Sequence, residues 1–271
     1  MSKQLLRSGF LSAFFVLGLS MNAAQALETK SESEKGIDRY RELIADGNPA
    51  ELWEAEGEEL WKKKAGPKNA SLEKCDLGLG AGVLKGAYVQ MPRYFDDAKQ
   101  VQDVEMRIAY CMKTIQGIEV RAGDYNKADH KNIIALATYV VTQSKGMPLS
   151  VRQSHPEEKL MYELGKRAFF YRSGPMDYSC ATCHNADGLR IRLQGLPNLT
   201  KTEPAGRAAT SWPAYRVSNS QLWPMQKRIN DCYRLQRFPH PKFGSDVTVA
   251  LSVYMGVNGA GVASLAPTIK R

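Results

Sequence analysis

Apolar residues recur at helical spacing along most of the chain, in segments separated by turns rich in glycine and proline. Apolar side chains that return every three to four positions are typical of helices that bury one face. The predicted helices are residues 28–46, a segment with Leu52, Trp53, Leu60 and Trp61 on one face, and residues 101–116, 131–145, 156–171, 222–236 and 246–256. The pattern predicts a mostly α protein with long loops, the longest over residues 188–224.

The order of these segments repeats once along the chain. In each half an amphipathic helix leads through a turn to a cysteine, and a strongly apolar helix follows later. The two apolar helices share a short similarity, residues 135–139 with residues 250–254. We therefore expect two tandem domains, residues 27–150 and 151–271, in which an early and a late helix cross while loops enclose the interior.

The first residues have the pattern of an export signal. Lys3 and Arg7 precede the apolar run of residues 9–19, and Ala24-Gln25-Ala26 is a typical cleavage site. Residues 1–26 are therefore predicted to be a signal peptide that is removed. No other stretch approaches the ~20 apolar residues that a membrane-spanning helix needs, so no membrane span is expected.

One stretch carries a specific chemical signature. Cys180-Ala181-Thr182-Cys183-His184 reads C-x-x-C-H, the attachment motif of a c-type haem. Two thiols at this spacing can form thioethers with the vinyl groups of one porphyrin, and the adjacent imidazole can bind the iron. A redox-active cysteine pair does not need the histidine, and a zinc site needs a further close ligand. The second domain is therefore predicted to be a haem-binding cytochrome c domain. Haem attachment and export both point to a bacterial periplasm.

The chain is basic, with 37 lysine and arginine residues against 28 acidic ones and a formal net charge of +9. Only two of the basic residues lie in the predicted signal peptide, so the excess survives its removal. Such a charge favours acidic partners or small anions through long-range attraction. Nucleic acid is another partner of basic chains, but export and haem argue against it.

Three cysteines remain outside the haem motif. Cys75 stands where the second half has its first haem thiol, but Gly78 and Leu79 take the places of the second thiol and the histidine. The first domain is therefore predicted to be haem-less, and the chain to hold one haem. Cys75 and Cys111 lie in the same exported half, which favours a disulfide between them. Two buried free thiols, or a bond from either cysteine to Cys232, are the alternatives.

Cys232 is then the unpaired cysteine, within a basic helix. Arg228 precedes it by one helical turn and shares its face. A guanidinium at this place would favour the thiolate, which is both a nucleophile and a metal ligand. A buried structural thiol is the alternative. Other candidates for the second axial position on the iron are Met225, Met255, His130, His155 and His240.

Taken together, these residues resemble the SoxA family, the cytochrome subunits of the periplasmic sulfur-oxidising complex SoxAX, an L-cysteine S-thiosulfotransferase. The likeness covers nearly all of the chain after residue 26. It is carried by residues 71–78 (SLEKCDLG), 143–148 (QSKGMP), 180–184 (CATCH), 212–216 (WPAYR) and 228–232 (RINDC). Family members have two cytochrome c domains, and many hold haem in both. The sequence after Cys75 departs from that pattern, so the chain resembles the single-haem type.

The resemblance implies a reaction and roles for particular residues. Members couple thiosulfate oxidatively to a cysteine on the arm of a SoxYZ-like sulfur-carrier protein, and a small SoxX-like c-type cytochrome completes a heterodimer and receives electrons. Carried over, Cys232 is an axial haem ligand and the catalytic cysteine that bears a persulfide, while Arg228 binds the substrate. Cys180 and Cys183 hold one haem c, and His184 binds its iron.

A plain periplasmic electron-transfer cytochrome is the competing function. It would have His184 and a methionine on the iron and no substrate. A haem domain that only docks a partner is a third hypothesis. Loss of turnover on changing Cys232, with the complex intact, would exclude it.

Overall fold

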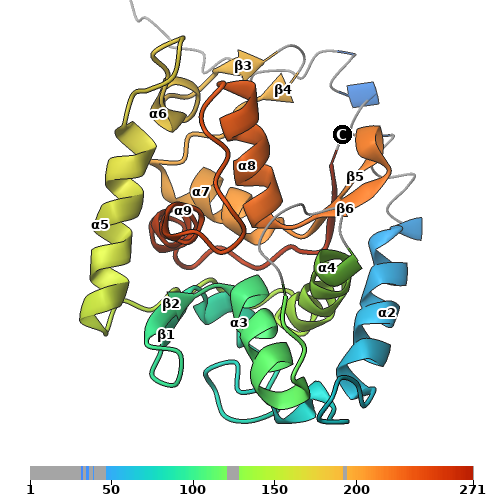
Figure 1. The fold of residues 1–271 in the computed structure, drawn as a ribbon. Helices are drawn as coiled ribbons and strands as arrows, with labels where there is room; N and C mark the ends of the chain where they lie inside the picture. The colour runs from blue at the N-terminus through green and yellow to red at the C-terminus, as the bar shows by residue number, and fades with distance from the viewer. Residues whose placement is uncertain are drawn as a thin grey trace, which may run out of the picture.

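The computed structural model describes residues 47–120, 128–191 and 194–270, together with Glu32, Lys35, Gly36 and Arg39. The predicted signal peptide and most of the predicted helix over residues 28–46 lie outside these ranges. The α-helices are α2 (Ala50–Lys62), α3 (Val104–Cys111), α4 (Ala128–Thr142), α5 (Pro156–Phe170), α6 (Cys180–His184), α7 (Thr202–Thr210), α8 (Met225–Leu235) and α9 (Asp246–Asn258). The strands are β1 (Arg93–Phe95), β2 (Gln100–Gln102), β3 (Arg190–Ile191), β4 (Gln194–Gly195), β5 (Ala214–Arg216), β6 (Gln221–Trp223) and β7 (Thr268–Lys270). The predicted mostly α fold is thus confirmed (Figure 1).

Two crossed helix pairs form the frame of the molecule, α2 with α4 and α5 with α9 (Figure 1). Gly57 in α2 lies so close to α4 that an added Cβ would overlap the carbonyl oxygen of Ala135. Gly165 in α5 stands in the same relation to Ala250 in α9. In both pairs the added Cβ would also lie 2.9 Å from the Cβ of the tyrosine four residues later on the partner helix. The matching contacts support the predicted repeat of one structural unit.

The interior of the first half is filled by side chains and closed by a disulfide. Cys75 and Cys111 are bonded, with their Cα atoms 5.7 Å apart. The buried side chains around them come from both crossed helices, α3 and the connecting loops; they include Trp61, Leu72, Leu77, Ile108, Met112, Ile133 and Leu136. Burying a large apolar side chain contributes about 1.5–3 kcal/mol, so this half has a core made of protein alone.

A small three-stranded sheet joins distant parts of the second half. β5 lies between β6, to which it is antiparallel, and β7, to which it is parallel. Arg216 at the end of β5 pairs with Gln221 on one side and with Lys270 on the other. The sheet therefore brings residues close to the end of the chain next to a segment more than fifty positions earlier. β1 pairs with β2, and β3 with β4, in two-stranded hairpins.

Polar contacts bind the first half to the second. The Tyr88 hydroxyl donates to the carbonyls of Ala209 and Trp212, at 3.1 and 3.0 Å. The buried Gln226 amide in α8 donates to Asp103 Oδ2 at 2.7 Å. The two halves are thus in direct contact through α3, α7 and α8, and the division near residue 150 stays a prediction.

Several local predictions differ from the structure. Leu52 is predicted on one face with Trp53, Leu60 and Trp61, but its side chain is 76% exposed, and the buried residues of that helix are Ala50, Gly57 and Trp61. The helix predicted over residues 101–116 ends as α-helix at Cys111 and continues as one π-helical turn, Met112–Gln116. The predicted irregular stretch contains α7, β5 and β6, because tertiary contacts order segments whose local pattern is weak.

Within the described ranges, no helix is both long enough and apolar enough to cross a membrane.

Candidate functional site

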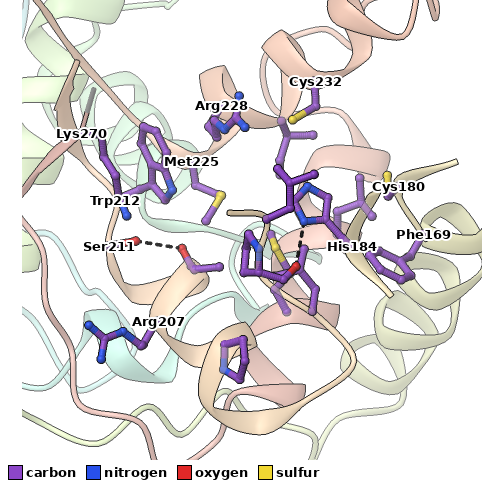
Figure 2. A pocket seen from close by; sticks show the side chains of 18 of the residues that line it. Phe169, Cys180, His184, Arg207, Ser211, Trp212, Met225, Arg228, Cys232 and Lys270 are labelled. Atoms are coloured by element: carbon purple, nitrogen blue, oxygen red, sulfur yellow. Dashed lines mark hydrogen bonds between the residues drawn. The ribbon is translucent and has the colours of Figure 1, made fainter. Parts of the chain in front are cut away.

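A cavity of about 630 Å³ lies in the second half, walled by α5, α6, α7, α8 and α9 and reached by β5 and β7. Its apolar lining includes Phe169, Leu199, Ile229, Leu251 and Met255. Its basic lining consists of Arg207, Arg216, Arg228 and Lys270. Figure 2 shows Cys180, His184 and Phe169 on one side of this space, Trp212 and Lys270 on another, and the α8 residues Met225, Arg228 and Cys232 over it. The cavity therefore joins a large apolar volume to a cationic wall.

The haem motif itself forms the short helix α6. Ser179 begins it with reciprocal bonds: its hydroxyl accepts from the Thr182 amide at 3.2 Å, and the Thr182 hydroxyl accepts from the Ser179 amide at 3.0 Å. One helical turn separates Cys180 from His184, so both side chains line the cavity. Cys183 lies on the same turn and is half-buried.

The ring of His184 is oriented by a backbone carbonyl. Its Nδ1 lies 2.9 Å from the Pro197 oxygen, and a carbonyl can only accept, so Nδ1 carries the proton. Nε2 is left as the atom able to bind a metal. Burial lowers the pKa of His184, against the opposing effect of that hydrogen bond. The structure thus holds the neutral ring in the tautomer that a metal ligand requires.

α8 carries the residues that face α6 across the cavity. Arg228 and Cys232 lie one turn apart on the same face and both line the space, as their spacing predicted. Arg228 Nη1 is 3.3 Å from Asp231 Oδ2, and Asp231 also accepts from Arg234 at 2.7 Å. Burial raises the pKa of the Cys232 thiol, while the charge of Arg228 acts in the opposite direction. Arg228 therefore favours the thiolate as expected, but burial outweighs it.

The other candidate axial ligands separate into two groups. Met225 and Met255 line the same cavity as Cys232. His130 is buried in the first half with its ring 4.7 Å from that of Phe243, outside this cavity. His155 caps α5 and stacks on Tyr94 at 3.7 Å, and His240 is exposed. Cys232, Met225 and Met255 are thus the sulfur-bearing candidates that the fold brings to the cavity.

Sequence reasoning gave no role to Arg207, Arg216 or Lys270. Arg207 belongs to α7, which the sequence pattern did not predict, and Lys270 comes from the far end of the chain. Arg216 occurs in one of the segments that carry the family resemblance, and this was the one available signal. The pairing of β5 with β7 brings Arg216 and Lys270 to the same wall of the cavity.

The residues present fit a covalently bound haem. The cavity is large and mostly apolar, it has Cys180 and a metal-competent His184 on one wall, and it has sulfur atoms from α8 and α9 on others. Cys180 and Cys183 carry no disulfide, which leaves both thiols for thioether bonds.

Comparison with known proteins assigns the family. The model for the SoxA/TsdA cytochrome c domain matches residues 56–149, within the half that lacks the C-x-x-C-H motif. The L-cysteine S-thiosulfotransferase subunit SoxA of Hydrogenophilus thermoluteolus is 57% identical over 240 residues, which are 88% of each chain. A subunit of the same name from Hydrogenobacter thermophilus is 37% identical over 248 residues, 90% of each chain. The chain belongs to the SoxA family.

A solved structure shares the SoxA fold of this chain. The crystal structure of SoxXA from P. pantotrophus matches with a TM-score of 0.72, at 23% identity, over 86% of this chain and 84% of that one. The predicted cytochrome c fold and the membership of the L-cysteine S-thiosulfotransferase subunits are thereby confirmed. Membership of the SoxA family, together with the C-x-x-C-H motif of residues 180–184, implies haem c as the cofactor.

Proposed function

We propose that this chain is the catalytic haem c subunit of a periplasmic complex that couples thiosulfate to a cysteine of a SoxYZ-like sulfur-carrier protein. A small SoxX-like c-type cytochrome would complete the heterodimer. The observation that carries the proposal is the convergence on one cavity of an unpaired cysteine, Cys232, a haem motif and Arg228. Membership of the SoxA family supports it.

Each site residue has a defined part in binding the cofactor. Cys180 and Cys183 would form the two thioethers, and His184 Nε2 would bind the iron. Cys232 would be the second axial ligand and the bearer of the persulfide. Since the first half has its own core and one disulfide, the chain would hold one haem.

The proposed reaction balances as an oxidative coupling of two sulfur nucleophiles. The sulfane sulfur of thiosulfate bonds to the sulfur of the carrier cysteine, the thiol gives up its proton, and two electrons are released. When bound, haem c in this chain and in the partner cytochrome would supply the one-electron acceptors for these two electrons. Arg228 holds the dianion by its oxygens, because a guanidinium offers paired donors in a fixed plane. Cys232 is partly buried and lines the cavity together with apolar side chains such as Ile229 and Leu251.

The test is a Cys232→Ser variant of the complex with its partner cytochrome. We expect the ferric haem spectrum to change because a sulfur ligand is lost, thiosulfate coupling to be abolished, and the haem content to stay the same because α6 is untouched. Met225→Leu and Met255→Leu are the matched controls, since both methionines line the same cavity. Full activity and an unchanged spectrum in Cys232→Ser would refute the proposal.

The alternative function is an electron-transfer cytochrome, favoured by the presence of Met225 and Met255 in the cavity. A methionine ligand would be revealed if Met225→Leu or Met255→Leu, rather than Cys232→Ser, altered the haem spectrum.

A further inference from the structure

Arg216 is one of the basic cavity residues, with Arg207 and Lys270, that the proposed reaction leaves without a role. Its backbone is fixed on both sides by β6 and β7, so the residue belongs to a rigid element. Its guanidinium carbon lies 5.2 Å from the centre of the Trp223 ring, and the side chain lines the cavity. The sheet therefore holds a cation in a constant place on the cavity wall.

This cation lacks the carboxylate partner that neighbouring arginines have. The Arg207 Nη1 atom lies 3.2 Å from Glu203 Oε1, and Arg228 Nη1 lies 3.3 Å from Asp231 Oδ2. In the part of the chain that the structure describes, Arg216 makes no ion pair, and its Nε is buried without a hydrogen-bond partner. The charge of Arg216 at the cavity wall is therefore not paired with a carboxylate of the described residues and is available to an anion in the cavity.

The position of Arg216 relative to Cys232 indicates which ligand. Burial lowers the pKa of Arg216, the positive charge of Arg228 lowers it further, and Asp231 and Cys232 act against this. The side chains of Arg216, Arg228 and Cys232 all line the same cavity. Two arginines from separate elements, β5 and α8, thus converge beside the proposed reactive sulfur.

We propose that Arg216 is a second substrate-binding residue, which together with Arg228 holds the oxygens of a sulfur oxyanion dianion while its sulfane sulfur faces Cys232. The inference rests on the proposed function and extends it. Asp231 compensates much of the charge of Arg228, so that pair alone cannot neutralise two negative charges. Arg216, which has no carboxylate of its own, supplies the missing charge and a planar set of donors that suits oxyanions.

The experiment uses the haem-loaded heterodimer with Arg216→Gln, Arg216→Lys and a matched control, Lys227→Gln. Lys227 also lies over the Trp223 ring, at 5.0 Å, but does not line the cavity. Steady-state turnover is measured against thiosulfate, inhibition against sulfate, and haem content and midpoint potential on the same samples. We expect Arg216→Gln to raise the KM for thiosulfate roughly tenfold or more, the scale of one lost charged hydrogen bond, and to weaken inhibition by sulfate. Arg216→Lys should recover part of the affinity for thiosulfate and part of the inhibition by sulfate. In both Arg216 variants kcat, haem content and midpoint potential should hardly change.

Three results would overturn the inference. The first is an unchanged KM for thiosulfate in Arg216→Gln. The second is an equal rise in KM in Lys227→Gln, which would mean that the effect comes only from the lost net charge. The third is a shifted potential or lost haem in both Arg216 variants with unaltered inhibition by sulfate, which would make Arg216 a partner of a haem propionate. Cys232→Ser separates this inference from the proposed function. If Cys232→Ser is inactive while Arg216→Gln has the wild-type KM for thiosulfate, the proposed function stands and only the role of Arg216 in substrate binding is refuted.

Discussion

At the scale of single residues, the site depends on how burial and charge are balanced around three side chains. His184 is held neutral by burial and oriented by the Pro197 carbonyl. Cys232 has its pKa raised by burial, and Arg228 moderates this effect. The protein thus keeps its sulfur in an apolar space and places cations at its edge. This arrangement suits an anionic substrate that must approach a shielded sulfur.

Changing Arg228 tests that arrangement. Arg228→Ala should leave the haem content intact but lower turnover at low thiosulfate by roughly tenfold or more, because a charged hydrogen bond to the substrate is lost. Arg228→Lys should recover only part, since a point charge does not reproduce two donors in one plane. Steady-state kinetics over a range of thiosulfate concentrations checks this. Normal turnover of Arg228→Ala at low thiosulfate would contradict a substrate-binding role.

A second residue-scale prediction concerns the buried carboxyl pair, Asp103 and Glu105. Burial raises the pKa of Asp103 to about 6, and burial followed by the charge of Asp103 raises that of Glu105. A carboxyl group whose pKa is higher in the folded protein keeps its proton in the folded state at a pH where the unfolded chain has already lost it. The free energy of unfolding should therefore fall as the pH rises from about 4 to about 6, between the ordinary pKa of an aspartate, 3.8, and the pKa of Asp103 in the folded protein.

Thermal unfolding across that window measures the effect. We expect Glu105→Gln to make the loss of stability with rising pH less steep. Each proton that only the folded protein holds changes the free energy of unfolding by ~1.4 kcal/mol per pH unit. The exposed Glu56→Gln should retain the wild-type slope. Parallel curves for all three proteins would contradict the assignment.

At the scale of elements, the long helices were predictable and the parts between them were not. The helices predicted over 131–145, 156–171, 222–236 and 246–256 correspond to α4, α5, α8 and α9, with ends displaced by a few residues. Their apolar periodicity is local information. By contrast, β7 pairs with β5 across the chain, and no short-range pattern in residues 268–270 specifies that contact. For this reason Cys232 and Arg228 could be proposed from sequence, whereas the place of Arg216 could not.

The helix crossings give a prediction at the same scale. Gly57→Ala or Gly165→Ala would place a Cβ on the carbonyl oxygen of the partner helix, and overpacking of this kind costs typically 1–3 kcal/mol. Both variants should therefore unfold at lower denaturant concentration. Gly47→Ala is the control, because its added Cβ meets no atom within 4 Å. Equal midpoints for all three variants would argue against the close crossings.

At the scale of the whole molecule, the half without a haem motif supports the half that has one. Asp103, the N-cap residue of α3, accepts a hydrogen bond from Gln226 in α8. The Tyr88 hydroxyl donates to the carbonyls of Ala209 and Trp212, and Trp212 lines the cavity. The first half is thus part of the structure that holds the cavity walls in place. Its own interior is closed by side chains and by the bond between Cys75 and Cys111.

Two measurements test this division of roles. The pyridine haemochrome assay should give one haem per chain, and peptide mapping without reduction should recover Cys75 linked to Cys111. Changing both cysteines to serine should lower the stability by ~3–4 kcal/mol, given their separation of 36 residues, and leave the haem content unchanged. Two haems per chain, or a link from Cys232 to either cysteine, would contradict the proposed roles.

If Cys232 is the site of sulfur chemistry, the mass of the peptide that contains this cysteine will show it. Trypsin cuts after Arg228 and Arg234, so residues 229–234 form a short peptide with a single cysteine. We expect this peptide, taken from the active complex without reduction, to carry one extra sulfur atom that a thiol reductant removes. An unmodified thiol throughout turnover, in a complex that couples thiosulfate at its full rate, would rule out sulfur chemistry at Cys232.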